Sequence, residues 1–172
     1  AKNHFKGPVI IFEHRLMYEL DFVNNPNINE FKPFETKVDK YGKDITIVAT
    51  SIMVLEVRRA SEFLESIGID VEIIDMHSIS DPNTDLIFNS VKKTGKLLIA
   101  DTSWLPYGVA SEISRIIVER DPSVLKKPVI SLGMQFAPCP TAKSLEDLYY
   151  PDVRDIIDSV CKTVIGDIYD SS

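Results

Sequence analysis

From residue 42 onward, the apolar residues of this chain alternate between short runs and helical stripes. The short β-branched runs predict buried strands at 45–49, 71–75, 97–100 and 128–132. Apolar residues that recur every three or four positions predict helices over 54–67, 86–94, 108–119 and 153–164. This alternation predicts an α/β fold of three layers, αβα, in which a mainly parallel sheet carries helices on both faces.

The first forty residues do not follow this pattern. A lone β-branched and aromatic run at 9–12 predicts one further strand, and no partner strand lies near it in sequence. Residues 21–41 contain turn-forming Pro and Asn without a helical or strand period, which predicts a linker. We therefore expect three segments: a remnant of an upstream domain at 1–20, a linker at 21–41, and one domain at 42–172. A start just before a lone strand suggests a piece of a longer protein or a split gene product.

Composition narrows the range of partners. Lys and Arg number 19 and Asp and Glu 26, which gives a net charge of −7 without any long run of one sign. Such a balance provides no basic face for phosphates, so we expect no nucleic-acid partner. No apolar run reaches the length of a membrane span and no signal-peptide pattern is present, so we expect a cytoplasmic protein without membrane contact. The cysteines, Cys139 and Cys161, lack metal-site spacing, and an inert thiol is the plainer interpretation of Cys139.

Polar residues that follow the predicted strands are the candidates for chemistry. Thr50 and Ser51 lie between a strand and a helix, where their hydroxyls could hold an anion, although plain N-capping is the simpler interpretation. Gly108 opens a helix in the same way, but one glycine is not a phosphate loop. His77 and Asp101 could form an acid/base pair if adjacent strand ends bring them together. No nucleophile with suitable neighbours completes a triad, so we predict no catalytic residue, and the Cys and His spacing predicts no metal-binding residue.

Aromatic residues gather in the segment that follows the third of these strands. Trp104 and Tyr107 flank Leu105 and Pro106, and aromatic side chains are favoured in the cores of protein interfaces. We interpret this segment as a lid, a subunit contact or ordinary packing over the sheet edge.

Four collinear stretches carry a resemblance to a known family. They are Pro8-Val9-Ile10-Ile11-Phe12-Glu13-His14 with Leu16-Met17-Tyr18, Tyr41-Gly42-Lys43-Asp44 before the strand at 45–49, Ser90-Val91-Lys92-Lys93-Thr94-Gly95-Lys96, and Leu145-Glu146-Asp147-Leu148-Tyr149-Tyr150-Pro151-Asp152. Together they resemble the transketolase-like C-terminal domain in the beta subunit of thiamine-diphosphate-dependent 2-oxo acid dehydrogenases of the pyruvate, branched-chain and acetoin type.

The resemblance implies a function for the assembly more than for the chain. In such an assembly thiamine diphosphate and Mg²⁺ bind between an upstream pyrimidine-binding domain and a diphosphate-binding domain, here expected on an alpha chain. The C-terminal domain contributes mainly subunit contacts. We therefore expect a subunit-association domain that is inactive alone and binds no cofactor itself. Its expected partners are a second copy of itself, a thiamine-binding alpha subunit or upstream domain, or both.

Two departures from the family pattern leave alternatives open. The family commonly has a His-Glu pair after its third strand, where this chain has Asp101-Thr102-Ser103, and an Arg after its second strand, where this chain has His77. These departures are compatible with a changed substrate or a changed partner chain. The alternatives are the C-terminal half of a transketolase or deoxyxylulose-phosphate synthase, and a non-catalytic interaction or ligand-sensing domain with the same fold.

Overall fold

The computed structural model describes His14, Met17 and residues 35–166 of the 172. Its five-stranded sheet has the order β1-β3-β2-β4-β5. The strands are β1 (Lys37–Lys40), β2 (Ile45–Ala49), β3 (Val71–Asp75), β4 (Leu97–Trp104) and β5 (Ile130–Met134). The helices are α1 (Ile52–Ser66), α2 (Thr84–Thr94), α3 (Val109–Arg120), α4 (Lys143–Glu146) and α5 (Val153–Val164), with a short 3-10 helix at Pro122–Val124.

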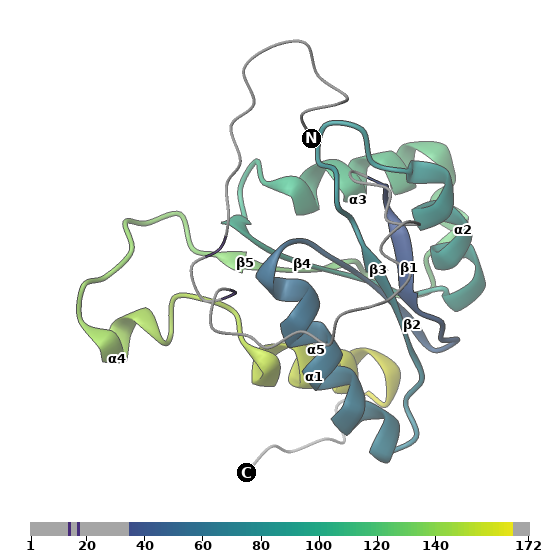
Figure 1. The fold of residues 1–172 in the computed structure, drawn as a ribbon. Helices are drawn as coiled ribbons and strands as arrows, with labels where there is room; N and C mark the ends of the chain where they lie inside the picture. The colour runs from purple at the N-terminus through teal and green to yellow at the C-terminus, as the bar shows by residue number, and fades with distance from the viewer. Residues whose placement is uncertain (1–13, 15–16, 18–34, 167–172) are drawn as a thin grey trace, which may run out of the picture.

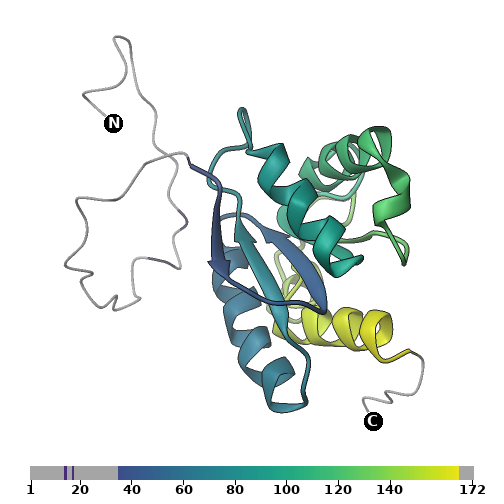
Figure 2. The same cartoon turned by 90° about the vertical axis from the view of Figure 1, so that its right-hand side faces the viewer.

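Helices cover both faces of the sheet, which confirms the three-layer prediction. α1 and α5 lie on one face, and α2 and α3 lie on the other (Figures 1 and 2). The four strands from β2 to β5 are parallel, and β1 alone runs antiparallel, beside β3. The sheet is therefore mixed only at one edge, as expected for a mainly parallel sheet.

The alternation of side chains along the strands builds two separate cores. Ile45, Ile47 and Ala49 of β2 point toward α1 and α5 and are fully buried, whereas Val48 points toward α2 and α3. Because successive side chains of a strand point to opposite faces, a strand covered on both faces must be apolar throughout. The continuous apolar runs of the sequence have this cause.

Helix ends follow the local chemistry. Asn83 caps α2 by accepting a hydrogen bond from the Leu86 backbone N–H, and Gly95 ends it in the left-handed conformation. Asp152 and Asp155 form a capping box at the start of α5. Phe63 of α1 and Ile67, directly after its last residue, are 41% and 40% exposed although both follow the apolar period of the helix.

Helix ends differ from the prediction by one or two residues, and the strands differ as follows. Lys37–Lys40, within the expected linker at 21–41, form the edge strand β1. The strand expected at 97–100 continues to Trp104 through a register shift against β5, so Trp104 lies at a strand end and not in a loop. The last strand begins two residues later than predicted. The strand expected at 9–12, and the segments 1–20 and 21–34 apart from His14 and Met17, lie outside the described residues, so the division into 1–20, 21–41 and 42–172 stays a prediction.

Candidate functional site

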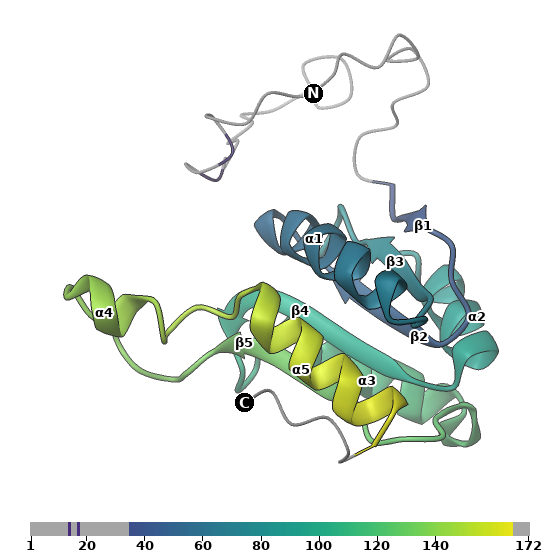
Figure 3. The same ribbon diagram turned by 90° about the horizontal axis from the view of Figure 1, so that it is seen from below.

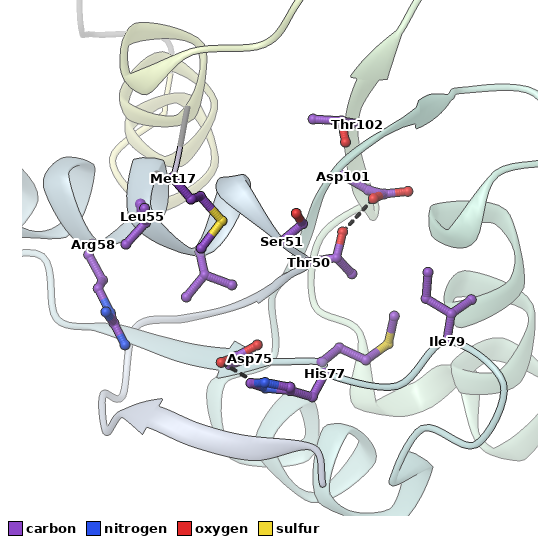
Figure 4. Close-up of a pocket in the computed structure, with 12 residues that line it drawn as sticks. Met17, Thr50, Ser51, Leu55, Arg58, Asp75, His77, Ile79, Asp101 and Thr102 are labelled. Carbon is purple, nitrogen blue, oxygen red and sulfur yellow. Dashed lines mark hydrogen bonds and ion pairs between the residues drawn. The ribbon is translucent and has the colours of Figure 1, made fainter. Parts of the chain in front are cut away.

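The carboxyl ends of β2, β3 and β4 enclose a pocket of about 420 Å³ (Figure 4). β2 leads through α1 to β3 on one side, whereas β4 leads through α3 to β5 on the other. The crevice between β2 and β4 is thus a topological switch point, the usual ligand position in open α/β sheets. Thr50 and Ser51 border it from one strand, and Asp101 and Thr102 from the other.

Asp101 ties the two sides of this crevice together. Its carboxylate accepts hydrogen bonds from the hydroxyls of Thr50 and Ser103, one on each oxygen. Both Thr50 and Asp101 are more than nine-tenths buried. Because a buried carboxylate needs such partners, the three side chains form a closed polar network that fixes the end of β2 against the irregular part of β4.

A second group of charges forms the wall of the pocket nearest β1. His77 Nδ1 lies 3.2 Å from Asp75 Oδ2, and Lys37 Nζ of β1 lies 3.6 Å from the same oxygen. Arg58, on α1, donates to both carboxylate oxygens of Asp39. This hydrogen-bonded pair raises the pKa of Arg58 above its ordinary value, so the guanidinium stays charged.

Ser51 does not cap α1, contrary to the plainer expectation from the sequence. Its side chain makes no capping hydrogen bond, and its backbone lies at φ 50° and ψ −128°. That conformation is rare for a residue with a side chain and is the kind of strain that functional sites can retain. The exposed Ser51 hydroxyl borders the pocket in Figure 4.

His77 and Asp101 both border this pocket. Asp75 is beside His77, and hydroxyls occupy both oxygens of Asp101. An acid/base pairing of His77 with Asp101 stays a prediction. Among the described residues, the contacts of Asp75 and Asp101 hold the strand ends in place.

Gly108 and Tyr107 form the tight turn before α3. A Cβ on Gly108 would lie 2.2 Å from the Trp104 carbonyl oxygen, so this position requires glycine. Tyr107 has a φ of 62° and is 98% exposed, so a left-handed backbone presents its ring to solvent. The role expected for this turn, a contact or a lid, stays a prediction.

Trp104 organises the segment 135–150, which we call the arm. Its indole N–H donates to the Tyr149 hydroxyl at 3.2 Å, and its ring packs edge-on against Phe136 at 4.7 Å between centroids. The Tyr149 hydroxyl donates in turn to the Ala137 carbonyl at 2.6 Å, which closes the base of the arm. α4 at its tip stands away from the rest of the domain (Figures 1 and 3).

The arm carries large apolar side chains that the domain does not cover. Leu148 is 83% exposed and Phe136 is 65% exposed, and Leu145 is also exposed. Cys139 lies on its exposed surface, where its hydrogen bond raises the pKa of Tyr150. An apolar segment of this kind indicates a contact surface.

Sequence reasoning missed Arg58, Asp75 and Leu55 of the pocket. Leu55 and Arg58 lie four and seven positions after Ser51, which places all three on one face of α1. Asp75 is the last residue of its strand, beside the position of His77. The helical spacing from Ser51 could have indicated Leu55 and Arg58. The position of an acidic residue at the end of a predicted strand could have indicated Asp75.

No group of three or more His, Cys, Asp or Glu side chains in the described part could hold a metal ion. None of its helices is both long and apolar enough to cross a membrane.

Comparisons with known proteins match the domain that the structure describes. The family model "Transketolase, C-terminal domain" matches residues 35–156. Pyruvate dehydrogenase E1 component subunit beta of Rickettsia bellii is 34% identical over 156 residues, which cover 91% of this chain and 48% of that protein. The beta subunit of an acetoin:2,6-dichlorophenolindophenol oxidoreductase of Cupriavidus necator is 31% identical over 160 residues, covering 92% of this chain and 47% of its own length.

A solved structure is similar over the same region. A split gene transketolase, described as an inactive beta4 tetramer, aligns with a TM-score of 0.70 at 30% identity and covers 85% of this chain and 47% of its own. The chain spans about half the length of the curated relatives it matches.

Proposed function

The chain belongs to the family of transketolase C-terminal domains, and from this premise we propose that it is the association domain of a beta-type subunit in a thiamine-diphosphate-dependent 2-oxo acid dehydrogenase. The observation that carries this proposal is the match to pyruvate dehydrogenase E1 beta subunits over 91% of the chain. In the complete assembly a 2-oxo acid would be oxidatively decarboxylated, while this domain holds subunits together. A cytoplasmic location belongs to the same proposal.

The arm supports an association role. It extends from the domain, yet the Trp104 indole and the Tyr149 hydroxyl hold its base in one position. A pre-ordered apolar segment loses little conformational freedom on binding, which favours a stable contact. We propose that the arm contacts a second copy of the chain, a thiamine-binding alpha subunit, or both.

The described residues do not fit the cofactor itself. Thiamine diphosphate is held with Mg²⁺, which binds oxygen ligands such as carboxylates. The described part has no suitable group of acidic side chains, and the charges of the strand-end pocket pair with one another. We therefore derive no catalytic step for these residues, and we propose that other polypeptide holds the cofactor.

Calorimetry tests the cofactor part of the proposal. Titration of the chain with thiamine diphosphate and Mg²⁺ is expected to give no binding tighter than a Kd of about 1 mM. Tight binding would contradict it. Mixing the chain with the complete alpha and beta-type partners then tests whether a 2-oxo acid acylates a lipoyl carrier.

Sedimentation velocity tests the association part. Leu148→Asp places a charge on a side chain that is 83% exposed, so it should leave the melting temperature unchanged and weaken association at least tenfold, about 1.4 kcal/mol. Val118→Asp, on the exposed face of α3, is the matched control. Equal association of both variants would count against the arm as the contact.

A transketolase is the second candidate, because the solved split gene transketolase aligns with a TM-score of 0.70. With the complete partner subunits, transfer of a ketol unit between sugar phosphates would favour this candidate. Acylation of a lipoyl carrier from a 2-oxo acid would favour the dehydrogenase.

A further inference from the structure

The two edge strands of the sheet differ in how they are protected. β1 reads Lys37-Val38-Asp39-Lys40, so charges and a register shift occupy one edge. β5 reads Ile130-Ser131-Leu132-Gly133-Met134 and carries no charge, and among the described residues no strand pairs with its outer side. Natural sheets usually protect an open edge with charges, proline or a bulge, because unpaired backbone groups attract other strands. The unprotected edge therefore indicates a strand that is covered in the working assembly.

The sequence segment that contains β5 also lacks carboxylates. No Asp or Glu occurs between Asp121 and Glu146, although the whole chain contains 26 acidic residues and has a net charge of −7. Two copies of such a chain repel each other over most of their surfaces. β5 itself contains no carboxylates, so a second copy that approaches along this edge meets the smallest electrostatic repulsion.

A groove of about 310 Å³ lies against β5. Residues 131–133 border it from the strand, and Leu148 and Tyr149 border it from the arm. Asp155 of α5 is the one carboxylate in its lining. The groove places exposed apolar side chains of the arm next to the open edge, so a strand added there would bury both together.

We propose that β5 pairs in antiparallel fashion with β5 of a second copy about a twofold axis, which extends the sheet across the dimer. A twofold contact is self-complementary, because each copy offers the same edge to the other. Backbone hydrogen bonds would supply the pairing, and the arm of each copy would cover the added strand. This inference rests on the proposed association function and names the surface that performs it.

Hydrogen exchange of the full chain, followed by mass spectrometry above and below the dimerisation concentration, tests the pairing. Dimerisation is expected to slow exchange of the outward-facing amides of 130–136 on the order of tenfold or more, and to leave the amides of β1 unchanged. Ser131→Lys adds a protective charge to the edge and is expected to raise the dissociation constant at least tenfold. Val118→Lys on α3 is the control that adds the same charge elsewhere.

The outcomes separate this inference from the proposed function. A dimer that Leu148→Asp weakens, but in which 130–136 exchange at the monomer rate, would overturn the strand pairing and leave the association function standing. A chain that is monomeric at every concentration and binds no alpha subunit would overturn both, and the open edge would then suit an extended segment of another protein. If Ser131→Lys fails to fold, hydrogen exchange of the unmodified chain still decides whether β5 pairs in the dimer.

Discussion

Ser51 illustrates how a single residue can look ordinary in sequence and be unusual in structure. It stands at the N-cap position of a 15-residue helix, yet it makes no capping hydrogen bond and holds a positive φ. The likeness to a cap came from its place between a strand and a helix, which fixes neither the backbone angle nor the direction of the side chain.

Replacing Ser51 by Gly should stabilise the domain. Glycine adopts the observed angles freely, so relief of strain outweighs its larger unfolded-state entropy, and we expect the free energy of unfolding to rise by about 1 kcal/mol. Ser51→Ala, which keeps the strain and loses no cap, should change it by less than about 0.5 kcal/mol. Urea denaturation measures both, and a Gly variant less stable than the unmodified chain would contradict this account.

Asp101 should contribute to stability through both of its oxygens. In Asp101→Asn one oxygen is replaced by an N–H donor, so one of the two hydroxyls must reorient or lose its partner, and we expect a loss of about 1–3 kcal/mol. Asp81→Asn, at an exposed loop position, is the control and should be near neutral. Equal urea midpoints for the two variants would show that the network contributes little.

At the scale of elements, the sequence predicted interiors better than ends. Helix and strand interiors follow the apolar period, and α2, α3 and α5 lie where the pattern placed them. The continuation of β4 to Trp104 was missed because Asp101, Thr102 and Ser103 are polar. Two of these polar side chains are satisfied there, because Asp101 accepts hydrogen bonds from the hydroxyls of Ser103 and of the distant Thr50.

The capping box of α5 offers a prediction at this scale. Asp152 accepts hydrogen bonds from the backbone N–H groups of Arg154 and Asp155, at 2.7 and 3.2 Å. Asp152→Ala should therefore lower the free energy of unfolding by about 1 kcal/mol. Asp158→Ala, within the same helix, removes a carboxylate without removing a cap and should have a smaller effect in thermal unfolding monitored by circular dichroism.

At the scale of the whole molecule, the domain includes a strand that the sequence assigned to a linker. Lys37–Lys40 read as a linker because four residues, three of them charged, carry no apolar period. The strand forms because β3 offers it an edge, while Asp39 pairs with Arg58 and Lys40 pairs with Glu65. Neither partner is near in sequence, so no local pattern could have indicated this strand.

Two truncations distinguish the boundaries. We expect residues 35–172 to unfold cooperatively with a free energy within about 1 kcal/mol of the full chain, because both cores lie after residue 44. Residues 42–172 lack β1 and should lose about 2–4 kcal/mol, since its strand hydrogen bonds and ion pairs disappear. Urea denaturation with comparison of m-values measures this. Equal stability of the two truncated chains would favour the boundary at residue 42.

The sequence by itself determined the layers of this protein. Burial on both faces of a parallel sheet requires continuous apolar runs and amphipathic helices, and both patterns can be recognised in the amino-acid sequence. It also carried the family resemblance, since the matched stretches are collinear along the chain. Only the tertiary structure decided which polar groups meet at the strand ends, that Asp101 bonds to Thr50 and Ser103 while Asp75 lies beside His77, and which edge of the sheet is left open. The contact of Asp101 with Thr50 joins residues that are distant in sequence, and it depends on strand order and on the irregularity of β4, which no local pattern of residues records.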